Sequence, residues 1–257
     1  MGQIFEHCNM PGTHFDDANL ARSIFTRVNL AGTTFHDVNL DGVTISNANL
    51  QDVKIDDANV AGLTIFGIDV SKLIDDEMDR RDPERARLRV HDFYDPADVR
   101  RVMARVEPLR ASFRAQLSSI ADVTLATRPS PNEWSVIEIV RHLLFTEELY
   151  LNRLILQNDR PFSRLGQLPE HMQAGRPGYE TVGTEVCSDL ATVWAAWDAA
   201  HAETLFYLAN LTPEVLKRPA KTPEGHPRAA GERLQVVAMH VLGHIRQAEQ
   251  VLAALGL

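Results

Sequence analysis

Apolar residues recur at every fifth position through the first seventy residues of the chain. The series runs from Phe5 to Val70 without a change of register, and a smaller or branched residue stands two positions before each later member. A period of five matches neither the α-helix nor the β-strand, so each unit must turn a corner before the next begins. The pattern therefore predicts a repeated coil whose two inward positions alternate in size.

This repeat resembles the pentapeptide-repeat family, whose A-(D/N)-L-x-x consensus is matched at Ala18-Asn19-Leu20, Ala48-Asn49-Leu50 and Ala58-Asn59-Val60. The resemblance implies a right-handed, four-sided β-helix with twenty residues in each coil, and we expect it to occupy residues 1–72. Residues twenty apart would then stack, as in the ladder Phe5, Phe25, Ile45 and Ile65.

A cap and linker is expected over residues 73–94. Stacked repeats need covered ends, and the stretch from Ser71, with Leu73, Ile74 and Met78, is the candidate cap. The following charged stretch, residues 79–89, has the composition of a solvated connector. The boundary between two domains is therefore predicted here.

Beyond residue 94 the apolar spacing changes to three and four residues, the period of the α-helix. The predicted helices cover about 95–120 with a kink at Pro108, 131–157, 184–209 and 232–255. The second is apolar around most of its circumference, which indicates burial. Residues 158–183 contain several glycines and prolines and read as a long crossover that can cover a site. The pattern predicts an all-α four-helix bundle over residues 95–257.

Three histidines within these helices are candidate metal ligands. His240 and His244 are one helical turn apart and continue an apolar stripe, so they should face the interior. Buried imidazoles need partners, and two core histidines bonded to carboxylates or backbone would satisfy this requirement. With His142 from the buried second helix, the set can instead hold a divalent metal and leave coordination positions open, as catalytic zinc sites do.

The sequence around these histidines is similar to that of the DinB-like superfamily. Residues 132–143 (NEWSVIEIVRHL) match its W-S-x-x-E-x-x-x-H-L signature, and residues 240–247 resemble its closing H-x-x-x-H-x-x-Q helix. The resemblance covers roughly residues 95–257 and implies a divalent metal, often zinc or nickel, on His142, His240 and His244. Several members of this superfamily transfer a low-molecular-weight thiol, so the resemblance also implies this activity. We expect a metal-dependent thiol transferase acting on a small-molecule substrate, or else a hydrolase, with the catalytic side chains unassigned.

The other candidate side chains carry weaker signals. His201 shares a helical stripe with Trp197, which fits either a core residue or a support for the metal ligands, and Asp198 and Glu203 could orient such groups. Trp194 and Trp197 are expected to pack in the core. Solvated side chains are expected for five further histidines, namely His7, His14, His36, His171 and His226.

The net charge of −9 is concentrated in the repeat, where nine acidic and three basic residues give −6 over residues 1–70. No basic stripe is present to neutralise phosphates, so direct nucleic-acid binding is not expected. The acidic column supplies the alternative hypothesis, a non-catalytic protein that binds a protein partner. Some pentapeptide-repeat proteins imitate DNA and bind topoisomerases, although three and a half coils make a short imitation.

Cysteine usage and hydropathy indicate the compartment. Cys8 and Cys187 give no disulfide framework and are expected in the core, which suits a reducing cytoplasm. Neither a signal peptide nor an apolar run of membrane-spanning length is recognised, so no membrane association is expected. A homodimer through bundle faces or coil ends remains open at this point.

Overall fold

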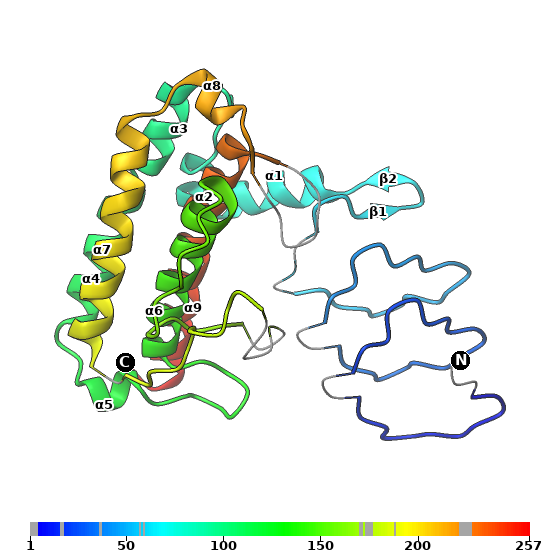
Figure 1. The fold of residues 1–257 in the computed structure, drawn as a ribbon. Helices are drawn as coiled ribbons and strands as arrows, with labels where there is room; N and C mark the ends of the chain where they lie inside the picture. Colours follow the sequence, from blue (N-terminus) through cyan, green and yellow to red (C-terminus); the bar gives the residue numbers. More distant parts are fainter. Residues whose placement is uncertain are drawn as a thin grey trace. The chain divides into compact units, whose positions relative to one another are not determined.

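The computed structural model describes residues 5–15, 18–35, 38–56, 58, 60–169, 172, 177–187, 189–220 and 228–257 (Figure 1). The chain divides into two compact units, Met1–Ala48 and Asn49–Leu257. The helices and strands all belong to the second unit: β1 (Thr64–Ile65), β2 (Ile68–Asp69), α1 (Ser71–Arg81), α2 (Pro83–Arg87), α3 (Pro96–Met103), α4 (Val106–Leu117), α5 (Asp122–Leu125), α6 (Val136–Glu147), the π-helix η1 (Glu148–Ile155), α7 (Leu190–Ala209), α8 (Pro213–Leu216), β3 (Pro219–Ala220), β4 (Arg228–Ala229) and α9 (Ala230–Ala254).

The backbone of the repeats turns at regular intervals. Hydrogen bonds from residue i+3 to residue i close a turn every ten residues, at 20–23, 30–33, 40–43, 50–53 and 60–63. The asparagine before several of these turns accepts a bond from the amide two residues later, as Asn19 Oδ1 does from Ala21. Positive φ angles recur every twenty residues, at His7, Arg27 and Asn47. The local geometry thus has the predicted five-residue sides.

The predicted β-helix is not found in the described residues, whose strands form only two short antiparallel pairs, β1–β2 and β3–β4. A β-helix needs backbone bonds between successive coils. In the described repeats the turns instead bond within themselves. The expected ladder residues Phe5, Phe25 and Ile45 are accordingly 64%, 59% and 63% exposed. Cys8, expected in the core, is exposed as well.

The segment after the repeats, where a cap and a connector were expected, contains the helices α1 and α2. Helix α1 begins where a cap was predicted, but its Leu73 and Met78 side chains are exposed. Asp75 and Asp79 lie one turn apart on α1 and pair with two arginines that follow, Arg85 and Arg89. Charge pairing between two short helices therefore orders a stretch whose composition suggested solvent exposure.

The predicted helical domain is confirmed, and α6 lies at its centre. Helix α6 packs against both α7 and α9, and α3 and α4 also contact α9 (Figure 1). Trp197, Phe113 and Phe145 are the largest fully buried side chains. In the described part of the chain, none of the helices combines the length and apolar character needed to cross a membrane.

Three helix boundaries differ from the prediction because single residues, a proline in one case and side-chain caps in the other two, decide them. The first predicted helix breaks between α3 and α4, before Pro108, which then lies in the first turn of α4, where it needs no hydrogen bond. Helix α6 begins at Val136 because Ser135 and Glu138 form a capping box. Helix α7 begins at Leu190, capped by the Asp189 carboxylate.

Replacing Ser135 by alanine is expected to lower the free energy of unfolding by about 1 kcal/mol. The substitution removes the acceptor of the Glu138 amide, at 3.3 Å, and a hydroxyl that contacts the Glu138 carboxylate at 2.9 Å. Chemical denaturation measures the change. Ser118→Ala is the control, because its hydroxyl is exposed at the end of α4. Equal losses in the two variants would contradict a specific role for this cap.

Candidate metal centre

The structure brings His142, His240 and His244 together between α6 and α9. One ring nitrogen from each lies within 4.8 Å of those of the other two, and the Nε2 atoms of His142 and His240 are 3.2 Å apart. His142 is buried, whereas His240 and His244 are half-buried. The three rings thus converge at a place that is accessible to solvent on the side of α9, which carries the two half-buried histidines.

Hydrogen bonds orient two of the three rings. His142 Nδ1 lies 3.0 Å from the backbone carbonyl of Gln167, and His244 Nδ1 lies 2.7 Å from Gln247 Oε1. Both partners are oxygen atoms that accept, so each Nδ1 carries the proton and each Nε2 keeps its lone pair. A second partner of this kind is the usual support of a metal-binding histidine.

The donor set fits a divalent transition metal. Nitrogens bound at about 2.0–2.1 Å to one tetrahedral zinc lie about 3.3 Å apart, close to the His142–His240 separation. Burial, followed by the neighbouring His244 and His142 rings, lowers the pKa of His240 well below its usual value. The ring is therefore neutral at neutral pH, which is the state that binds metal.

Aromatic side chains border the cluster. The Trp134 ring lies 4.8 Å from the His142 ring and stacks on His244 at 6.2 Å. Tyr150 lies 6.3 Å from His240 and belongs to η1, where a bond from Leu156 to Leu151 shows the wide i→i+5 turn. π-Helical turns inside α-helices often occur at functional sites. Trp134 and Tyr150 thus place aromatic ring surface beside the histidine cluster.

A family model described as the DinB superfamily matches residues 73–248 of the chain. The chain belongs to the DinB superfamily. The model of a pentapeptide repeat region matches residues 3–73, so the two predicted resemblances are confirmed. Neither the curated proteins nor the solved structures include a match to the chain.

The weaker candidates that the structure describes lie outside the histidine cluster of the DinB domain. Asp198 pairs with Arg110 and Arg114, and Glu203 pairs with Arg160, so neither acid orients a metal-binding ring. Trp194 and Trp197 stack on each other with ring centres 4.8 Å apart, as expected for core residues. His7 and His14 are exposed. His36, His171 and His226 lie outside the described residues.

A buried polar network on α6 was missed in the sequence. The Glu147 carboxylate accepts a bond from Trp197 Nε1 at 2.6 Å and lies 2.5 Å from His201 Nδ1. The other His201 nitrogen lies against Glu107. The available signal was an acid at the end of a helix whose apolar residues cover most of its circumference. This network holds α6 to α7 in the DinB domain and contributes no ligand to the cluster.

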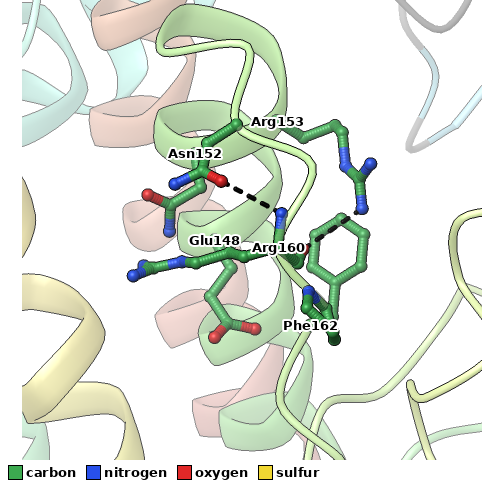
Figure 2. A pocket seen from close by; sticks show the side chains of 7 residues that line it. Glu148, Asn152, Arg153, Arg160 and Phe162 are labelled. Atoms are coloured by element: carbon green, nitrogen blue, oxygen red, sulfur yellow. Dashed lines mark hydrogen bonds between the residues drawn. The ribbon is translucent and has the colours of Figure 1, made fainter.

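A small hollow beside η1 is also separate from the cluster (Figure 2). Glu148, Arg153, Arg160 and Phe162 are among its lining residues. Burial raises the pKa of Glu148, although its carboxylate accepts a bond from the Ser163 amide at 2.9 Å. The hollow marks the place where the crossover segment leaves the helix.

Replacing Gln247 by alanine is expected to weaken zinc binding by roughly tenfold, the usual effect of removing a partner of a metal-binding histidine. The substitution removes the Gln247 acceptor that orients His244 Nδ1, so the ring is held less firmly in the tautomer that binds metal. Competition against a chromophoric chelator measures the affinity. Gln250→Ala, at an exposed position of the same helix, is the control. Unchanged affinity in the Gln247 variant would contradict this role.

Proposed function

We propose that the DinB domain is a metal-dependent enzyme that presents an activated nucleophile to a small electrophilic substrate. A low-molecular-weight thiol is the first candidate nucleophile and water is the second. The observation that carries this proposal is the convergence of three imidazoles whose ring nitrogens lie within 4.8 Å of one another. Zinc or nickel suits such a set of neutral nitrogen donors.

The side chains of this chain have definable tasks in such a reaction. His142, His240 and His244 would hold the ion, and Gln167 and Gln247 would keep two of the rings oriented. A divalent ion on three neutral imidazoles supplies a Lewis acid that lowers the pKa of a thiol or water at the open positions. Trp134 and Tyr150 would exclude bulk water from one side of the substrate. Three protein ligands favour catalysis over a structural role, which usually takes four.

Activity of the zinc-loaded and nickel-loaded protein tests the proposal. Tag-free protein is incubated with a thiol and an electrophilic halide, and separately with activated esters. The proposal predicts metal-dependent thiol conjugation that disappears in His240→Ala. Ester hydrolysis alone would favour water as the nucleophile. Bound metal without activity in either series would contradict the enzyme and favour the alternative, a binding protein supported by a metal.

A further inference from the structure

The crossover between η1 and α7 folds back on itself as a two-limbed strap. We define the strap as residues 158–169 and 177–187, its described parts. The limbs bond to each other, for example from the Glu185 amide to the Arg164 carbonyl at 3.1 Å. Two arginines of the α6–η1 helix, Arg141 and Arg153, bind both limbs. The strap is therefore attached to the same helix that supplies His142.

Arg141 binds the part of the strap nearest the histidine cluster. Its Nε donates to the Leu165 carbonyl at 2.8 Å, and one terminal nitrogen contacts the carbonyls of Gly166 and Glu185 at 3.3 and 3.1 Å. The Arg141 side chain is only 5% exposed. A buried guanidinium without acceptors costs several kcal/mol, so this residue strongly favours the docked strap.

The residues that come next in the chain, Gln167 in the strap and His142 in α6, make the contact that reaches the histidine cluster. The Gln167 amide donates to the Arg141 carbonyl at 3.2 Å, and the Gln167 carbonyl accepts from His142 Nδ1 at 3.0 Å. Arg141 and His142 thus bind three consecutive strap residues. Gln167 directly follows the strap residues that Arg141 binds. The docking of Arg141 therefore fixes the position of the Gln167 carbonyl.

Arg153 binds a more distant part of the strap and offers a matched control. One terminal nitrogen contacts the Arg160 carbonyl at 3.3 Å (Figure 2). The same nitrogen contacts the Gly178 carbonyl at 3.1 Å. Its guanidinium also lies 5.0 Å from the Phe162 ring centre. Arg153 resembles Arg141 in binding both limbs, but its partners do not include a residue that touches a metal-binding histidine.

We propose that Arg141 is a positioning residue of the metal centre and that strap docking and metal binding are coupled through the Gln167 carbonyl. The inference rests on the proposed metal site. A docked strap fixes the His142 tautomer in which Nδ1 carries the proton and Nε2 does not, so docking strengthens metal binding. By linkage, bound metal must stabilise the docked strap by the same factor. The supporting hydrogen bond sets the expected size of the coupling at roughly 10–100-fold.

The test compares full-length wild type, Arg141→Met and Arg153→Met. Methionine keeps most of the side-chain volume and removes every donor. Zinc affinity is measured by chelator competition, and hydrogen exchange of strap amides is followed by mass spectrometry with and without zinc. Arg141→Met is expected to bind zinc at least about tenfold more weakly, whereas Arg153→Met stays within about threefold of wild type. Zinc is expected to slow exchange at residues 165–167 in wild type and in Arg153→Met only.

If the Arg141→Met variant does not fold, the Gly166→Ala variant tests the coupling in its place. A Cβ at this position would lie 3.1 Å from Val182 and 3.2 Å from Phe145, so it shifts the strap beside Gln167 without removing a charge. A fewfold loss of zinc affinity is expected. Wild-type affinity in this variant, with faster strap exchange, would overturn the coupling.

Two further outcomes separate this inference from the proposed function. Wild-type zinc affinity in Arg141→Met, or equal losses in both arginine variants, would overturn the role of Arg141 and leave the metal site intact. Absence of zinc binding by wild type would overturn the metal site and the coupling together.

Discussion

Replacing Glu147 by alanine is expected to lower the free energy of unfolding by about 3–5 kcal/mol, because two buried donors lose their acceptor. Glu147 is 3% exposed and its carboxylate binds two buried donors, Trp197 Nε1 and His201 Nδ1. Alanine leaves both donors without an acceptor and opens a cavity between α6 and α7. Chemical denaturation followed by tryptophan fluorescence measures the loss.

An exposed acid provides the matched control for Glu147. Glu249 pairs with Arg246 on the surface of α9, and exposed pairs contribute about 0–1 kcal/mol. Glu249→Ala should therefore leave the free energy of unfolding nearly unchanged. A loss below about 1 kcal/mol in Glu147→Ala would contradict the network, because unpaired buried groups cost more than that.

The Glu147 contribution should also depend on pH. Burial alone would raise the pKa of Glu147, but the hydrogen bonds of His201 and Thr204 and the nearby charge of Arg110 help to outweigh it, and the pKa is lowered. A lowered pKa means that the stabilisation is complete above the ordinary carboxyl pKa of about 4.3 and is lost as the pH falls through the folded-state value. The stability difference between wild type and Glu147→Gln should therefore shrink under acid conditions. A difference that grows on acidification would contradict this sign.

Replacing His142 by alanine is expected to weaken zinc binding by at least about a hundredfold. Four-ligand zinc sites have apparent binding free energies of about 10–16 kcal/mol, or roughly 3 kcal/mol for each ligand. His142 also connects the cluster to the Gln167 carbonyl, so its loss removes a ligand and its support together. Zinc at a hundred times the dissociation constant raises wild-type stability by about 2.7 kcal/mol, and this increase should vanish in the variant.

His201→Ala controls for the loss of a buried histidine. His201 is as buried as His142 but binds Glu147 and Glu107 in place of the cluster. The variant should lose stability and keep its zinc-induced rise in melting temperature. Retained zinc binding in His142→Ala, with binding lost in His201→Ala, would contradict the assignment of the ligands.

The helical domain could be predicted from the sequence because its apolar residues follow the helical period over long segments. Helix starts could not be placed as well, since single side chains such as Ser135 and Asp189 decide them. The five-residue period predicted the turns of the repeats correctly. It could not predict whether coils bond to one another, because a β-helix depends on contacts between residues twenty apart.

The three clustered histidines could be selected because His240 and His244 lie on one helical face and His142 lies in a helix that is apolar around most of its circumference. Gln247 could have been assigned as well, being one turn from His244. The Gln167 carbonyl could not, because a backbone oxygen in a long crossover has no sequence signature. The role of Arg141 could not be predicted either, because its acceptors are backbone carbonyls of the strap.

The metal content and ligand distances of tag-free protein test the metal centre most directly. Elemental analysis should find one zinc or nickel ion per chain, and X-ray absorption should place nitrogen donors at about 2.0–2.1 Å from zinc. His142→Ala should contain little metal after the same purification. Metal-free wild type that binds no added zinc, or equal metal content in wild type and His142→Ala, would contradict a site formed by these three histidines.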